Sequence, residues 1–275
     1  MSLLRVESLT KKFGGLNAVE DLSFDIQSGS VHSIIGPNGA GKTTLLNLLT
    51  GVYQPSAGKI VFAEQDLTGR APHDYASHGI ARTFQNLQVF FNMSALENVM
   101  VGRYLHERCG LVSAMLRGRR LRRAEQTGRD EAAELMRYVG LQDYLGAAAD
   151  AMPYGALKRL EIARALATRP KLMLLDEPAA GLNPTEALEL DHLIVRLTER
   201  GITVVLVEHN MRLVMGVSDH ILVLDYGRKL AEGPAQAIRN DPKVIEAYLG
   251  SSAPQDPTFG KEIANAVAVA VEMHR

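Results

Sequence analysis

The sequence predicts an α/β fold whose core is a mainly parallel sheet covered by helices on both faces. Short apolar runs with strand character recur along the chain, and segments with helical periodicity separate them. The run Leu172–Leu175 is continuously apolar, as parallel strands buried on both faces are. The pattern turns helical from Ser94 to about Gly140, which predicts a helical subdomain inserted into this core.

The first part of the chain predicts strands, a turn and one helix. Residues 2–7 and 22–26 alternate apolar and polar side chains, as half-buried strands do. Between them, Lys11–Gly15 is predicted to form a turn that carries Phe13. The Phe13 ring could stack on an adenine or anchor the loop in the core, and the sequence leaves both open. A buried strand is predicted at Val31–Ile35, and a helix at Thr44–Leu49.

The middle of the chain predicts two more strands, at residues 60–62 and 80–84, before the helical stretch. Five arginines crowd one short part of that stretch. A solvated helix face is the favoured interpretation, and contact with lipid phosphates or a membrane partner is the alternative. These residues are Arg117, Arg119, Arg120, Arg122 and Arg123.

The remaining elements continue the alternation of helix and strand. A helix rich in Ala, Leu, Arg and Glu is predicted at Ala156–Ala167, and a second helix begins at Pro184 and runs to about Arg200. Further strands are expected at residues 202–207, 220–225 and 228–232, with a closing helix at 242–249. The composition changes from Ser251, so residues 1–250 are predicted to form the main domain and 251–275 an extension.

Bulk composition narrows the class of protein. The 275 residues carry a formal net charge of -1, so a surface that coats nucleic acid is not indicated. The single cysteine, Cys109, excludes an internal disulfide and suits a reducing compartment. The sequence has neither a signal-peptide pattern nor an apolar run of roughly 20 residues, so a membrane role would require a partner.

A glycine-rich stretch fits the pattern G-x-x-x-x-G-K-[ST] between a predicted strand and a predicted helix. Its glycines let backbone N–H groups turn inward toward phosphate oxygens, and the helix N-terminus adds a positive dipole end. Its lysine supplies a cation for the outer phosphates, and its first threonine can ligate magnesium. The phosphate loop so predicted comprises Gly36, Pro37, Asn38, Gly39, Ala40, Gly41, Lys42, Thr43 and Thr44.

Four polar residues follow predicted strands at the edge where a parallel sheet carries its ligand. Asp176 can hold Mg²⁺ through water, and Glu177 can accept a proton from a water that attacks the γ-phosphate. Gln85 could join the magnesium shell or position that water. His209 could donate a hydrogen bond to the γ-phosphate.

With these motifs in this order, residues 1–250 resemble the ATP-binding subunits of ABC transporters. The resemblance implies a P-loop NTPase core with an N-terminal antiparallel β portion and a helical subdomain at about 94–168. It assigns Phe13 to adenine stacking, Gln85 to the Q-loop, Leu172–Glu177 to Walker B with the catalytic glutamate, and His209 to the switch histidine. It also implies two ATPase subunits that close head to tail on two ATP molecules.

The closest resemblance is to the importer subunits for branched-chain, hydrophobic amino acids. It is carried by Ala81–Gln85, Glu177–Pro184, Glu208–Met211 and the run from Asn240 to Gly250. It implies transmembrane permease subunits and, indirectly, a solute-binding protein. It also implies a second ATPase subunit, which is a different chain or, as the alternative, a second copy of this one. The expected location is the cytoplasmic face of the inner membrane. Importers for urea, amides or aromatic acids, and soluble or regulatory ATPases of the same type, are the alternatives.

One segment departs from the family pattern. Most members have Leu-Ser-Gly-Gly-Gln where this chain has Met152–Ala156, hereafter the signature segment. Pro153 offers no hydroxyl, although proline suits the first helical turn, and Ala156 offers no amide. Tyr154 and Gly155 remain as nucleotide-binding candidates, so a weakened contact is expected. Pro153→Ser with Ala156→Gln should then raise ATP turnover of the complex. The loop Ala180–Asn183 also has Asn183 where many members have Asp.

Overall fold

The computed structural model describes residues 2–105 and 119–250, which form two compact units. Among the described residues, unit 1 comprises 2–49, 53–69 and 205–250, and unit 2 comprises 50–52, 70–105 and 119–204. Each unit has its own buried core, and each is described separately below. Strand β8 (Thr203–Val207) begins in unit 2 and ends in unit 1.

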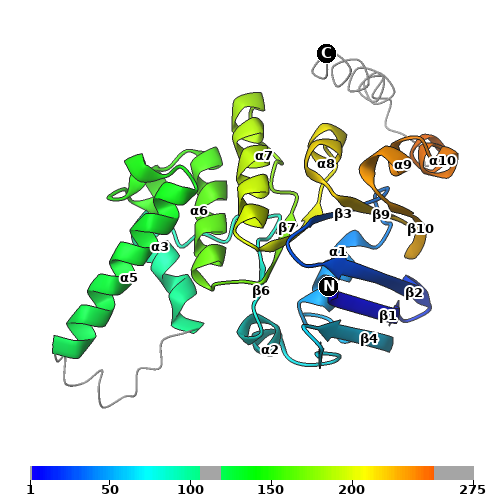
Figure 1. Cartoon of the computed structure of the whole chain (residues 1–275), viewed down its shortest axis with the longest axis horizontal. Coiled ribbons are helices and arrows are strands. Elements are labelled where there is room, and N and C mark those ends of the chain that lie inside the picture. The colour runs from blue at the N-terminus through cyan, green and yellow to red at the C-terminus, as the bar shows by residue number, and fades with distance from the viewer. Residues whose placement is uncertain (1, 106–118, 251–275) are drawn as a thin grey trace. The chain divides into compact units, whose positions relative to one another are not determined.

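Unit 1 contains the antiparallel sheet expected at the N-terminus, with strand order β2-β1-β4-β5 (Figure 1). Buried residues alternate with exposed ones along β1, which is the pattern that predicted a half-buried strand. The predicted strands are confirmed but are longer, because β1 runs through the expected turn to Phe13 and leaves only Gly14 and Gly15 to reverse the chain. The strands are β1 (Ser2–Phe13), β2 (Leu16–Gln27), β4 (Ala57–Phe62) and β5 (Gln65–Asp66).

The second part of unit 1 carries the parallel pairing. Strand β3 (Val31–Ile35) is buried along its whole length and pairs in parallel with β9 (His220–Asp225), which pairs antiparallel with β10 (Arg228–Gly233). Helix α1 (Lys42–Leu49) follows β3 and begins two residues before the predicted start. The remaining helices are α8 (Met211–Val217), α9 (Ala235–Arg239) and α10 (Pro242–Gly250).

The turn between β9 and β10 is hydrogen-bonded to the phosphate loop just before α1 begins. The N–H of Gly227 donates to the carbonyl of Ala40 at 3.0 Å, and the N–H of Glu20 donates to the carbonyl of Gly227 at 2.8 Å. Arg228 adds an ion pair with Glu20 at 2.7 Å. Tyr226, at the tip of the same turn, is 81% exposed. Hydrogen bonds therefore join the turn to the phosphate loop and to β2, although its tip lies in solvent.

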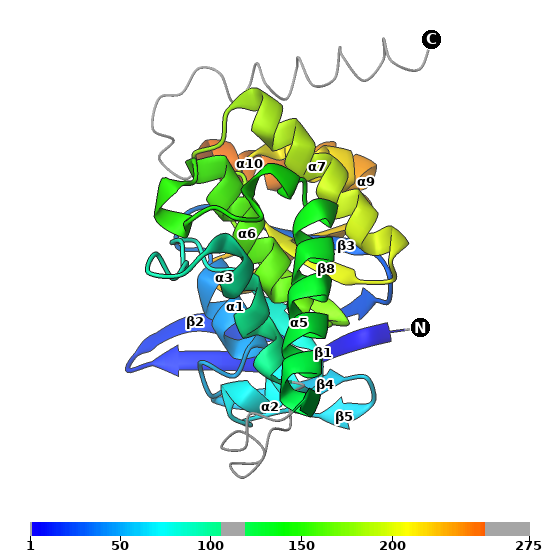
Figure 2. The same cartoon turned by 90° about the vertical axis from the view of Figure 1, so that its left-hand side faces the viewer.

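In unit 2, strand β6 (Ile80–Arg82) pairs in parallel with β7 (Leu172–Asp176). Helices α3 (Ala95–Val101), α5 (Arg119–Tyr138) and α6 (Tyr154–Ala167) pack together (Figures 1 and 2). Strand β6 ends two residues before the predicted end, although the N–H of Thr83 still donates to the carbonyl of Leu174. Within the described residues, the predicted helical stretch is helical at 95–105 and 119–138. The helices are α2 (Pro72–Ser77), α3 (Ala95–Val101), α5 (Arg119–Tyr138), α6 (Tyr154–Ala167) and α7 (Pro184–Glu199), with 3₁₀ turns at Gly102–Leu105, Gln142–Tyr144 and Ala149–Ala151.

Three sequence predictions concern parts of the chain outside this description. Cys109 and the extension 251–275 lie outside the described residues. Arg117 also lies outside them. The other four clustered arginines fall in the first turns of α5, where only the backbone is described. Both interpretations of that cluster stay as predictions.

Candidate nucleotide site

The phosphate loop occupies the turn from β3 into α1, as predicted. Gly39 and Gly41 have φ angles of 82° and 99°, in the left-handed region that favours glycine. A Cβ on Gly41 would collide with the carbonyl oxygen of Ala18, so the backbone packs too closely there for any side chain. The N–H of Leu45 donates to the carbonyl of Gly41 at 2.9 Å, which leaves the N–H groups before it outside the helix ladder.

Lys42 turns back into the loop that it follows. Its Nζ atom donates to the carbonyls of Gly36 at 2.7 Å and Pro37 at 2.9 Å, and the residue is 7% exposed. Carbonyl oxygens therefore bind the buried ammonium, which in the predicted phosphate loop would bind phosphate oxygens. Thr43, the next residue, is exposed and presents a hydroxyl of the kind that Mg²⁺ accepts as a ligand.

Phe13 lies at the end of β1 with 43% of its surface exposed. Its ring packs edge-to-face on Tyr53 with centroids 5.3 Å apart, and the ammonium of Lys11 lies 5.0 Å from its centroid. Both interpretations of Phe13, adenine stacking and loop anchoring, therefore stay open. Tyr53 packs against the ring, and the exposed part of the ring is accessible to a ligand.

In unit 2, residues at or after the ends of β6 and β7 form two pairs of polar side chains. Asp176 accepts from Arg82 at 2.8 Å, and both side chains are almost fully buried. Gln85 Nε2 donates to Glu177 Oε2 at 2.9 Å. Glu177 has a φ of 48°, which costs energy for a non-glycine residue and which the surrounding structure must hold in place. Gln85 and Glu177, which the sequence assigned separate roles, are thus in direct contact.

Sequence reasoning did not assign a role to Arg82 or Lys158. Arg82 neutralises the buried carboxylate of Asp176 from the neighbouring strand. Lys158 on α6 is 4% exposed and donates to the carbonyl of Gln85 at 3.0 Å. It therefore connects α6, which the signature segment begins, to the segment that carries Gln85. Arg82 was visible in the sequence as a charge at the end of an apolar strand, whereas Lys158 looked like an ordinary charge on a helix.

The signature segment leads into α6 with Pro153 at the N-cap, one residue before the first turn in which the sequence placed it. Pro153 has no side-chain hydrogen bond to the helix, and the first helical bond runs from the N–H of Leu157 to its carbonyl at 3.0 Å. The N–H groups of Tyr154, Gly155 and Ala156 therefore precede the helix ladder and share the positive end of the helix dipole.

Two neighbours restrict the signature segment. A Cβ on Gly155 would collide with the carboxylate of Glu186, and Gly181 lies against the Tyr154 ring. Tyr154 is 44% exposed, and the ammonium of Lys158 lies 5.7 Å from its ring centroid. Ala156 is only 1% exposed, so its position has no room for a longer side chain.

Asn183 has a defined structural role at the start of α7. Its Oδ1 atom accepts the N–H groups of Thr185 at 3.0 Å and Glu186 at 2.9 Å, while Glu186 accepts the N–H of Asn183 in return. This is a capping box with proline in the first turn. Asn and Asp are equally good N-caps, so the departure from the family pattern leaves this helix start intact.

His209 lies after β8 in unit 1 and is exposed, as a residue that meets a ligand must be. The buried carboxylate of Glu208 accepts the N–H of His209 at 3.0 Å and that of Asn210 at 3.3 Å. Asn210 in turn caps α8 through the N–H of Leu213. Glu208 and Asn210 thus help to fix the turn that carries His209.

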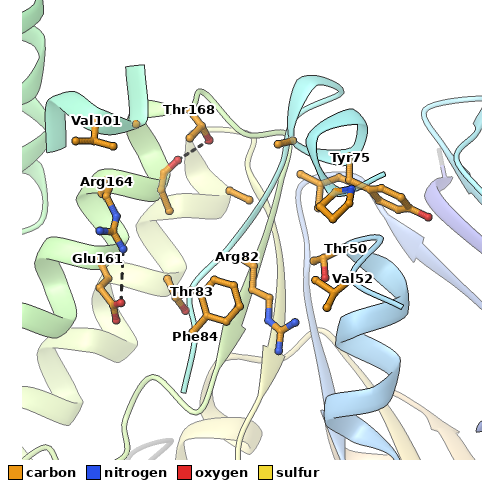
Figure 3. Close-up of a pocket in the computed structure, with 16 residues that line it drawn as sticks. Thr50, Val52, Tyr75, Arg82, Thr83, Phe84, Val101, Glu161, Arg164 and Thr168 are labelled. Atoms are coloured by element: carbon orange, nitrogen blue, oxygen red, sulfur yellow. Dashed lines mark hydrogen bonds and ion pairs between the residues drawn. The ribbon is translucent and has the colours of Figure 1, made fainter. Parts of the chain in front are cut away.

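Unit 2 also contains a hollow of about 390 Å³, shown in Figure 3. Helices α2 and α6, the end of β6 and the segment after α1 line it. Glu161 is 3% exposed on one wall and accepts the N–H of Gln88 at 2.6 Å, while its Oε2 atom has no hydrogen-bond partner among the described residues. Burial raises the pKa of the Glu161 carboxyl, which the Gln88 N–H and Arg164 partly oppose.

Two searches of the described ranges bear on metals and membranes. Within residues 2–105 and 119–250, no three His, Cys, Asp or Glu side chains are grouped to hold a metal ion. Oxygen ligands of the type that Mg²⁺ combines with nucleotide phosphates are present singly, at Thr43, Gln85 and Asp176. Across the same ranges, no helix has the length and apolar character that crossing a bilayer requires.

Comparison with known proteins gives concordant matches. The family model "ABC transporter" matches residues 19–180, and "Branched-chain amino acid ATP-binding cassette transporter" matches 228–254. The chain is 43% identical to the high-affinity branched-chain amino acid transport ATP-binding protein BraF of Pseudomonas aeruginosa, over 91% of this chain and 98% of BraF. Identity to LivG of Escherichia coli K12 is 44% with the same coverage. A solved ATP-binding cassette of an ABC transporter, in its ADP conformation, has a TM-score of 0.79 at 32% identity over 91% of this chain and 100% of that one.

Proposed function

Because the chain belongs to the ABC transporter family of ATP-binding, ATP-hydrolysing proteins, we propose that it energises the import of branched-chain and other hydrophobic amino acids. The names of BraF and LivG support this cargo, as does the match to the branched-chain model over residues 228–254. Residues 1–250 form the cassette in this proposal, with the helical subdomain at about 94–168. The protein acts at the cytoplasmic face of the inner membrane, where permease subunits hold it.

The proposed chemistry is in-line transfer of the γ-phosphoryl group to water. The backbone of Gly36–Thr44 cradles the phosphates, and Lys42 exchanges its carbonyl partners for phosphate oxygens. Thr43, Gln85 and Asp176 are the residues that would hold Mg²⁺ together with the nucleotide. The metal, when bound, neutralises charge on the phosphate oxygens.

Glu177 is the proposed general base, and its contact with Gln85 carries the assignment. Gln85 Nε2 donates to the Glu177 carboxylate at 2.9 Å and so orients it. Glu177 itself has a φ of 48°, a strained conformation that the surrounding structure maintains. His209 donates to the γ-phosphate, and Phe13 stacks on the adenine. The N–H groups of Tyr154 and Gly155 meet the nucleotide held by a second ATPase subunit.

The hollow of unit 2 supports the proposal that a permease segment docks on the helical subdomain. Its buried Glu161 offers an acceptor oxygen without a partner in the described structure, which suits a donor side chain on the permease. Phe84 lines the hollow and is 44% exposed, and Phe90, whose ring centroid lies 5.4 Å from the Arg164 guanidinium, is 43% exposed, so apolar surface accompanies the acceptor. A solute-binding protein would act on the permease rather than on this chain.

The test is Glu177→Gln in the complete complex, with the exposed carboxylate of Glu134 on α5 changed to Gln as the matched control. ATP binding should persist, while hydrolysis falls by about 100-fold or more, because a general base contributes about 10²–10⁴-fold. Uptake of radiolabelled leucine should be lost with it. Unchanged hydrolysis in Glu177→Gln would remove Glu177 from the role of base.

The cargo is tested by uptake measurements on cells that contain the complete complex. Leucine should compete with labelled isoleucine and valine for uptake, whereas urea and aromatic acids should not. Import of urea or an aromatic acid, with no import of leucine, would assign the chain to one of the related importers. ATP hydrolysis that proceeds without any membrane partner or uptake would favour a soluble, regulatory role.

A further inference from the structure

Helix α10 packs against α9 and β10, and its apolar residues belong to a cluster that reaches the strand leading into the phosphate loop. Its Val244 is 6% exposed and joins an apolar cluster that contains Ile35, the last residue of β3. Tyr248 packs on the same cluster. Val244 and Tyr248 are four residues apart, so they share one face of the helix. Helix α10 therefore shares its buried face with the point at which β3 ends and the loop begins.

The Tyr248 side chain also makes a polar contact with the loop itself. Burial raises the pKa of the Tyr248 hydroxyl, and a hydrogen bond with the backbone of Gly36 opposes that rise. A contact that favours the deprotonated form comes from a donor, so the N–H of Gly36 donates to the phenolic oxygen. The tyrosine hydroxyl thus binds the first residue of the phosphate loop from outside the loop.

Gly36 is consequently held through both of its backbone groups. Its carbonyl accepts from Lys42 Nζ at 2.7 Å, and its N–H donates to Tyr248. A Cβ at this position would collide with the carbonyl oxygen of Leu224 on β9, so the residue is also enclosed sterically. If Lys42 turns to phosphate oxygens, the Gly36 carbonyl loses that donor, whereas the contact with Tyr248 needs no nucleotide.

We propose that Tyr248 is a positioning residue of the nucleotide site, which fixes the corner between β3 and the phosphate loop for ATP. This inference rests on the ATP-binding function. The hydroxyl keeps the empty loop in the conformation that phosphates require, so that less conformational freedom is lost on binding. It also gives a role to the C-terminal run that matches the branched-chain model over residues 228–254.

The test is Tyr248→Phe in the full-length chain, which removes the hydroxyl and keeps the ring on its apolar cluster. ATP affinity, measured by titration calorimetry, should fall by about three- to tenfold, the range that one net hydrogen bond supports. Affinity for adenosine, which has no phosphates, should stay within about twofold. Hydrogen exchange of the Gly36 amide in the nucleotide-free protein should accelerate by a similar factor.

Tyr138→Phe is the matched control, because the Tyr138 hydroxyl is buried without a hydrogen-bond partner in the described ranges. It should leave both affinities and the Gly36 exchange rate unchanged. ATP affinity of Tyr248→Phe within twofold of wild type, or an equal loss for adenosine, would overturn the inference alone. A wild-type chain that fails to bind ATP would overturn the proposed function and this inference together.

Discussion

The phosphate loop and the signature segment both present backbone N–H groups at a helix N-terminus, yet they are built differently. In the loop, Gly39 and Gly41 adopt left-handed conformations and Lys42 buries a cation among carbonyl oxygens. The signature segment enters α6 from an extended Pro153, and none of its residues has a positive φ. The groups that it offers a ligand are the N–H groups of the first helical turn.

This difference shows why one motif is complete in the sequence and the other is not. A loop that depends on positive φ and on one ammonium group cannot change those residues without losing its shape or its charge. A helix N-terminus offers the same N–H groups and dipole whatever side chains surround it. The signature segment is restricted mainly at Gly155, where Glu186 excludes a side chain.

The largest expected effect comes from removing the loop's cation. Lys42→Ala should weaken ATP binding by about 100-fold, because it deletes charge-assisted hydrogen bonds to the phosphates. Lys59→Ala, an exposed lysine of unit 1, is the matched control and should change binding less than twofold. Calorimetry on the full chain measures both. Equal affinities for the two variants would show that the loop backbone alone binds the phosphates.

A smaller effect should follow from completing the signature segment. Pro153→Ser adds a hydroxyl at the exposed N-cap, so ATP turnover of the assembled complex should rise by about threefold, while Pro153→Ala should not raise it. Ala156→Gln is now expected to cost about 1–3 kcal/mol of stability, since Ala156 is buried. Steady-state turnover and thermal unfolding measure the two effects. No gain with Pro153→Ser would show that backbone N–H groups suffice.

The smallest expected effect concerns Asn183. Asn183→Asp should change the free energy of unfolding by less than about 0.5 kcal/mol, whereas Asn183→Ala should cost about 1 kcal/mol. Denaturant unfolding of the full chain measures both. A large loss with Asp would mean that the Asn183 side-chain N–H₂ group, and not only its capping oxygen, is needed at this position.

Most of the fold could be predicted because its strands are short apolar runs between helices with clear caps. The continuous run Leu172–Leu175 and Pro184 at the start of α7 are examples. Strand ends were less predictable, since β1 continues through Lys11–Phe13, a polar stretch beside two glycines. There, pairing with β2 outweighs local turn preference.

The candidate site was predictable where a residue's role depends on local sequence, as in the phosphate loop. It was not predictable where the role depends on a distant partner. Arg82 contacts Asp176 across 94 positions, and Lys158 contacts Gln85 across 73. Tyr248 lies 212 positions after Gly36 in the sequence. No spacing rule connects such pairs, because folding alone brings them together.

The β9–β10 turn has a consequence for anyone who wishes to label or tag this protein. Exposed hairpin tips usually tolerate insertions, and Tyr226, at 81% exposure, would be an obvious choice for a fluorophore or an epitope. The next residue, Gly227, donates its N–H to Ala40 inside the phosphate loop. A label at this tip would therefore report on the nucleotide loop, and an insertion there would disturb it.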